Sequence, residues 1–214
     1  MFNFLVLTIA VTISFFINAD EIQLADSHGP ISIMGDHMHK KGEFMFSYRF
    51  GKMNMNNVAN GTKKINTNSV MSSPNGASKN LGNYMNAPTS MKMNMHMFGG
   101  MYAPSDNLTF MIMTSYQEKV MTQQRMPMAG GSRFNVNSSG FGDTRISTLI
   151  NIFNNDHTKT HIGIGLSLPT GNIDQRDTTP ASSNARLGYS MQNGTGTYDA
   201  LFFLNNINKF GKLK

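Results

Sequence analysis

Apolar and polar side chains alternate with a period of two in six separate segments of this 214-residue chain. In the segment GEFMFSYRFGKM, for example, aromatic side chains occupy every second position, at Phe44, Phe46, Tyr48 and Phe50. Because successive side chains of a β-strand point to opposite faces, this pattern predicts strands rather than helices. The six predicted strands cover residues 42–53, 91–102, 107–120, 140–153, 158–168 and 197–208.

The connections between these strands alternate in length. Residues 103–106 (APSD) and 154–157 (NNDH) are short turns built from residues that favour turn conformations. Long polar connections, rich in Gly, Asn and Ser, fill 54–90, 121–139 and 169–196. Outer-membrane barrels combine short turns with long loops, and their strands cross the membrane in about 9–11 residues. The pattern therefore predicts an all-β, antiparallel up-and-down meander of a transmembrane β-barrel, with a secreted soluble barrel or sandwich as the alternative.

The N-terminal segment is typical of a secretory signal. An apolar run at 4–17 is followed by Asn-Ala-Asp at 18–20, which predicts cleavage after Ala19. The run is shorter than the roughly 20 apolar residues of a membrane-spanning helix, and hydroxyl side chains interrupt it. We therefore expect a signal peptide at 1–19, a periplasmic segment at 20–41, and a partial barrel at 42–214 in the outer membrane of a Gram-negative bacterium.

Composition narrows the classes of function. The chain has no cysteine, which excludes a disulfide framework, a thiolate metal site and a thiol nucleophile. Its formal charge is +6, but lysine and arginine are scattered, so the sequence does not predict a nucleic-acid partner. Neither G-x-S-x-G, H-E-x-x-H nor a P-loop occurs, and we expect no enzyme activity.

In a membrane barrel the apolar face of each strand contacts lipid and the polar face lines the lumen. On the strand 91–102, this rule assigns the methionines of MKMNMHM to lipid and the residues between them to the lumen. Applied to every strand, it predicts a lumen lined by Glu43, Arg49, Lys92, Asn94, His96, Asp143, Arg145, Lys159, His161 and Asp199. Because charges of both signs occur, we expect only a mild ion preference.

Methionine and histidine also suggest a metal site, because thioethers and imidazoles select Cu(I). The candidate ligands come from MGDHMH and MKMNMHM and are Met34, His37, Met38, His39, Met93, Met95 and His96. Neighbours on one face of a strand stand about 7 Å apart, so one ion would draw its ligands from different segments. An outer-membrane copper-binding protein, and a structural β-protein without transport, are therefore the alternatives to a channel.

Five spaced blocks stand in order between Ile33 and Leu201: IMGDHMHKKGEFMFSYRF, MKMNMHMFGGMYAPSDNLTFMIMTSY, SSGFGDTRIS, GLSLPTGNID and MQNGTGTYDAL. In these blocks the chain resembles the outer-membrane family described as putative MetA-pathway of phenol degradation. The resemblance implies a transmembrane β-barrel of the transporter kind, with outer-membrane lipid around it. It also implies passage of small solutes, aromatic or hydrophobic ones among them.

Six strands are too few for a closed barrel, since transmembrane barrels have at least eight. The segment 63–71 is weakly strand-like, but its Asn-rich surroundings favour a loop, and beyond Leu201 the resemblance ends. We therefore expect a truncated family member: an incomplete barrel of about six strands, with the first and sixth at open edges. Such edges need missing strands or other copies of the chain to cover them.

Overall fold

The computed structural model describes residues 35–75, 82–155 and 157–208. The predicted signal peptide at 1–19, the first part of the predicted periplasmic segment and Met34 lie outside these residues. Within the described part of the chain, no helix is long and apolar enough to cross a membrane. The fold is all-β, and its paired strands are antiparallel.

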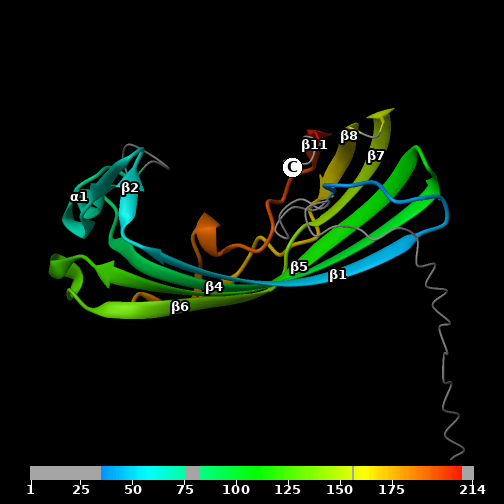
Figure 1. Cartoon of the computed structure of the whole chain (residues 1–214). Helices are drawn as coiled ribbons and strands as arrows, with labels where there is room; N and C mark the ends of the chain where they lie inside the picture. Colours follow the sequence, from blue (N-terminus) through cyan, green and yellow to red (C-terminus); the bar gives the residue numbers. More distant parts are fainter. Residues whose placement is uncertain (1–34, 76–81, 156, 209–214) are drawn as a thin grey trace, which may run out of the picture. The chain divides into compact units, whose positions relative to one another are not determined.

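One large sheet dominates the fold, with the strand order β1-β4-β5-β7-β8-β11 and an additional strand, β6, paired to β5 (Figure 1). Its strands along this path are β1 (Phe44–Asn56), β4 (Asn86–Ser105), β5 (Leu108–Arg125), β7 (Thr144–Asn154), β8 (Thr158–Leu168) and β11 (Asp199–Asn208). Each of the six predicted strands is present, in the predicted order. The period-two pattern therefore located the meander correctly.

Strand β6 (Arg133–Phe141) lies where the sequence predicted part of a long loop, so that prediction is wrong. It pairs with β5 along Tyr116–Gln124, whereas β7 pairs with the same edge of β5 along Leu108–Met113. β6 and β7 therefore lie one after the other along the same edge of β5, and Gly142 and Asp143 connect them. The sequence did not predict β6, because its asparagine and serine residues do not form an apolar stripe.

The other long connections also contain short elements. β2 (Val58–Asn60), β3 (Lys63–Ile65) and α1 (Thr67–Met71) follow β1, so the segment predicted to be a loop is partly ordered as a hairpin and one helical turn. The carbonyl oxygen of the Asn66 side chain accepts a hydrogen bond from the Ser69 amide at 2.7 Å and caps α1. The connection after β8 contains the hairpin of β9 (Arg176–Thr179) and β10 (Ser182–Arg186). Short 3-10 turns occur at η2 (Pro127–Ala129) and η3 (Tyr189–Met191).

The two ends of the sheet are β1 and β11, as the sequence predicted. Among the described residues, β1 pairs only with β4 and β11 only with β8. Both predicted short turns are present, one between Ser105 and Leu108 and the other between Asn154 and Thr158. The described sheet is therefore open at both edges.

The register of the strands defines two faces, because directly opposed residues of an antiparallel pair share a face. The aromatic face carries the pairs Phe44–Tyr102, Phe46–Gly100, Tyr48–Phe98 and Phe50–His96. The methionine face carries the pairs Met45–Met101, Arg49–Met97, Met53–Met93 and Met101–Met111. The register of the remaining strands extends the aromatic face and the methionine face over the whole sheet.

Candidate functional site

The aromatic face presents large apolar side chains to its surroundings along every strand of the main sheet. Phe46 near one edge is 84% exposed and Phe202 near the other is 75% exposed, far more than packed core residues. Other exposed apolar residues on this face are Phe44, Tyr48, Phe50, Phe98, Tyr102, Phe110, Ile112, Phe141, Ile146, Ile164, Leu166 and Leu204. An apolar surface of this extent marks contact with lipid or with another protein.

Aromatic pairs lie at both ends of this apolar band. At the end near the short turns, Phe44 and Tyr102 stack with ring centroids 4.3 Å apart. At the other end, Tyr116 and Phe141 meet edge to face at 5.3 Å. On β5 the band runs from Leu108 to Tyr116, or about 26 Å along the strand at about 3.3 Å per residue. At the strand tilt of about 40° found in outer-membrane barrels this length covers about 20 Å of the membrane normal, close to their apolar band of about 25 Å, and the aromatic ends resemble their lipid-facing surface.

The methionine face carries polar groups beside its methionines, and other parts of the chain partly cover it. Lys119 is 6% exposed, and its Nζ donates hydrogen bonds to the carbonyl oxygens of Gln192 at 2.5 Å and Ser190 at 3.4 Å. Beside it, the Ser138 hydroxyl donates to the Met191 carbonyl at 2.7 Å. A small core of Met121, Val136, Leu187 and Met191 packs at the same place. The connection between β8 and β11 thus folds back over β5 and β6.

The segment 35–43 covers the methionine face near the short turns. The His161 ring and the Gly35 carbonyl are hydrogen-bonded at 2.7 Å, and the Asn205 side chain donates to the Asp36 carbonyl at 2.7 Å. The His39 amide donates to the Thr109 hydroxyl at 3.3 Å. Residues preceding β1 therefore lie across β5, β8 and β11.

Within this segment, the His39 ring is half-buried. Burial and the neighbouring His37 lower the pKa of His39, while the hydrogen-bonded Glu43 carboxylate and Asp36 oppose the shift. Its Nε2 is buried and makes no hydrogen bond to the described residues. The geometry favours the neutral ring, because protonation would leave a buried N–H without an acceptor.

Asp143 joins three of the sequence blocks that carry the family resemblance. Its carboxylate accepts hydrogen bonds from the Gly171 amide at 2.9 Å, the Thr195 amide at 2.7 Å and the Thr195 hydroxyl at 2.8 Å. Gly171 and Gly194 pack closely: a Cβ on Gly171 would lie 2.6 Å from the Gly194 Cα. SSGFGDTRIS, GLSLPTGNID and MQNGTGTYDAL therefore meet at one point. From its place in the sequence Asp143 is predicted only as a lumen charge, and this role was missed, although the flanking Gly and Thr residues were a signal.

The ten predicted lumen residues do not share one face. Lys92, Asn94 and His96 lie on the aromatic face, opposite Asn54, Lys52 and Phe50 of β1. The remaining seven lie on the methionine side of the sheet or beside its strand ends: Glu43, Arg49, Asp143, Arg145, Lys159, His161 and Asp199. The predicted orientation of the strand 91–102 is thus reversed, and its methionines belong to the same face as Arg49.

The candidate copper ligands are not brought together. The His37 and His39 rings are 4.9 Å apart, close to Thr109 at the start of β5. Met93, however, pairs with Lys119, about 33 Å farther along β5, and Met95 pairs with Gln117, two residues nearer. His96 points to the opposite face, where its Nδ1 shares a 2.8 Å hydrogen bond with the Tyr48 hydroxyl. In the described residues, no group of three or more His, Cys, Asp or Glu side chains could hold a metal ion.

Comparisons with protein-family models, with curated proteins and with solved structures find no match to this chain.

Proposed function

We propose that this chain is an outer-membrane channel protein whose aromatic face contacts lipid and whose methionine face lines a passage for small organic solutes. The observation that carries the proposal is the uncovered apolar band of the aromatic face, with aromatic pairs at both of its ends. On strands tilted by about 40° this band covers about 20 Å of the membrane normal, close to the roughly 25 Å apolar band of outer-membrane barrels. The resemblance of the five sequence blocks supplies the solute class, which includes aromatic and hydrophobic molecules.

The opposite face supports the passage. Arg49 pairs with Met97, and Arg145 pairs with Met113, so two cations of the methionine face lie beside polarizable thioethers. A lumen for small organic solutes combines such apolar contacts with polar groups that hold water. Because the described sheet is open, further strands or other copies of the chain are needed to enclose the passage.

Single-cysteine labelling tests the assignment of faces, and the chain suits it because it has no native cysteine. A fluorophore at Phe46→Cys should be quenched by lipophilic quenchers in reconstituted vesicles, and one at Ser47→Cys by aqueous iodide. Ile112→Cys and Met113→Cys give a second adjacent pair on β5. Equal access of both quenchers at Phe46→Cys and Ser47→Cys, repeated at the second pair, would exclude the proposed orientation.

A further inference from the structure

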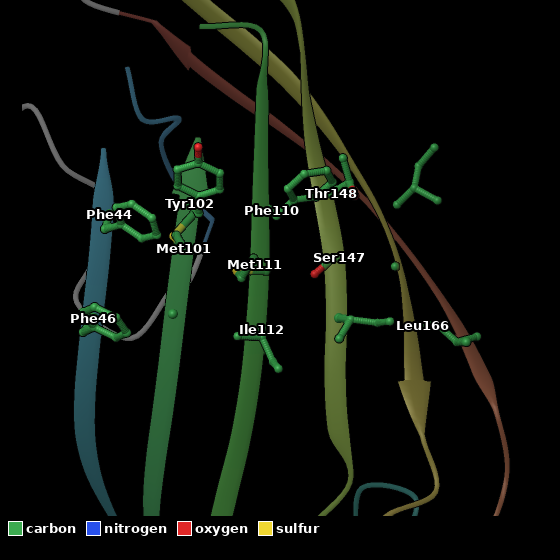
Figure 2. A pocket seen from close by; sticks show the side chains of 14 residues that line it. Phe44, Phe46, Met101, Tyr102, Phe110, Met111, Ile112, Ser147, Thr148 and Leu166 are labelled. Carbon is green, nitrogen blue, oxygen red and sulfur yellow. The ribbon is translucent and has the colours of Figure 1, made fainter. Parts of the chain in front are cut away.

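The aromatic face contains an apolar hollow of about 720 Å³ around Gly100. Its wall is formed by Phe44, Phe46, Tyr102, Phe110, Ile112 and Leu166, with other residues of β7 and β8 (Figure 2). Gly100 lies in the floor of this hollow, where a Cβ would make ordinary contacts, at 3.4 Å from Ile112 and 3.8 Å from the Phe46 ring. The space is open to a flexible apolar chain.

A second hollow, of about 550 Å³, lies beyond the Tyr48–His96 end of the apolar band. Lys52 of β1 and Lys92 of β4 line it, with Asn94 directly opposite Lys52. No hydrogen bond or ion pair engages either amine within the described part of the chain. Glu118 also lines the hollow, as do Lys119, whose amine is hydrogen-bonded to the Gln192 and Ser190 carbonyls, and Arg176, which is paired with Asp174 at 3.0 Å. The charges of Lys52, Lys92 and the one carboxylate therefore leave a net positive charge in the hollow.

The separation of the two hollows matches one leaflet of a membrane. Asn94 and Gly100 are six residues apart on β4, or about 20 Å along the strand. A tilt of about 40° reduces this distance to about 15 Å along the membrane normal, half of the roughly 30 Å hydrocarbon core. A headgroup at the basic hollow would thus leave its acyl chain at the depth of Gly100.

We propose that this strip of the aromatic face binds one phospholipid with an anionic headgroup. Its phosphate lies between Lys52 and Lys92, and an acyl chain follows β4 into the hollow at Gly100. Ammonium groups attract phosphate as point charges, and the carboxylate of Glu118 limits that attraction. This inference rests on the proposed function, because it needs the aromatic face to be in lipid.

Lipid titration of the purified full chain in detergent micelles tests the headgroup. Native mass spectrometry should show phosphatidylglycerol bound about tenfold more tightly than phosphatidylcholine. The double variant Lys52→Gln/Lys92→Gln should lose this preference, and Glu118→Gln should increase it. The matched control, Lys63→Gln/Lys64→Gln, removes the same charge from β3 and should keep it.

Narrowing the apolar hollow tests the acyl chain. Gly100→Val should weaken binding of both lipids and leave their ratio unchanged, while inorganic phosphate should not displace the bound lipid. Equal affinity of the wild type for the two lipids would overturn the inference. So would an equal loss of the preference for phosphatidylglycerol in the two lysine double variants, or displacement of the bound lipid by inorganic phosphate. If quencher access alternates between Phe46→Cys and Ser47→Cys but the lipid preference is absent, this inference fails while the proposed function stands.

Discussion

At the scale of single residues, small side chains make room for larger ones on the methionine face. Gly163 of β8 lies opposite Phe203 of β11, and a Cβ built on Gly163 would overlap the Phe203 ring. At Gly165, two residues further along β8, a Cβ would lie 2.6 Å from the Ile146 carbonyl and from Ser147. The sequence showed these glycines only as polar-face positions of a strand. It could not show which ring covers them, because cross-strand contacts depend on register.

Gly163→Ala should therefore lower the free energy of unfolding by about 1–3 kcal/mol, as overpacking does elsewhere. Replacing Phe203 with Leu in the same chain should restore part of the loss by removing the overlapping ring. Gly188→Ala is the matched control, since nothing lies within 4 Å of the Cβ position there. Chemical unfolding in detergent measures all three variants. Equal stability of Gly163→Ala and Gly188→Ala would contradict the overlap.

His39 should make stability depend on pH. Its pKa in the folded protein is lower than the ordinary value of 6.5, so the unfolded chain binds the proton more readily. The free energy of unfolding should consequently fall as the pH drops below about 6.5, until the folded protein also takes up the proton. Above that pH both states are neutral at this residue, and it contributes no pH dependence.

In unfolding titrations at pH 7.5 and 5.5, His39→Gln should lose less stability on acidification than the wild type. His157→Gln, at the exposed turn between β7 and β8, is the control and should behave as the wild type does. Identical losses in the wild type and His39→Gln would show that His39 is not the group responsible.

At the scale of elements, alternation identified strands well where one face is strongly apolar. In β8, isoleucine and leucine alternate with Gly, His and Ser, and the observed strand matches the predicted 158–168. In β6, only Phe134 and Val136 are apolar before Phe141, so the pattern gave no signal. The residues of β4 on the aromatic face change from Phe98 to Asn94 and Lys92 where the strand leaves the apolar band. The polar side chains of Asn94 and Lys92 mark the end of the apolar band and not the opposite face of the sheet. For this reason the sequence assigned the two faces of the strand 91–102 the wrong way round.

The connection between β8 and β11 is held by Asp143, and Asp143→Ala should loosen it. Loss of three hydrogen bonds to one carboxylate should accelerate amide exchange at Gly171 and Thr195 and lower the free energy of unfolding by about 1–3 kcal/mol. Asp174→Ala is the control, because its ion pairs with Arg176 and Arg186 are exposed and contribute little. Hydrogen exchange by mass spectrometry resolves the two segments. Unchanged exchange in Asp143→Ala would mean that Asp143 does not hold the connection.

At the scale of the whole molecule, the order of strands followed from the sequence, but the grouping of polar residues did not. The short turns fix consecutive strands as antiparallel neighbours, and this places β1 and β11 at the ends of the sheet. Unpaired N–H and C=O groups at such edges are costly in hydrocarbon, so a conducting form needs them paired with further strands. The face that becomes the lumen depends on how the strands register with one another, which the alternation in any single strand does not contain.

Charge reversal separates the two faces in a conducting assembly. Arg49 and Arg145 lie on the methionine face, whereas Lys92 lies on the aromatic face. Because the sign of charge along a lumen sets ion preference, Arg49→Glu and Arg145→Glu should each move the reversal potential toward cation selectivity under a salt gradient. Lys92→Glu makes the same change of charge on the face proposed to contact lipid and should leave the reversal potential unchanged. A shift with Lys92→Glu and none with the two arginine variants would place the passage on the aromatic face instead.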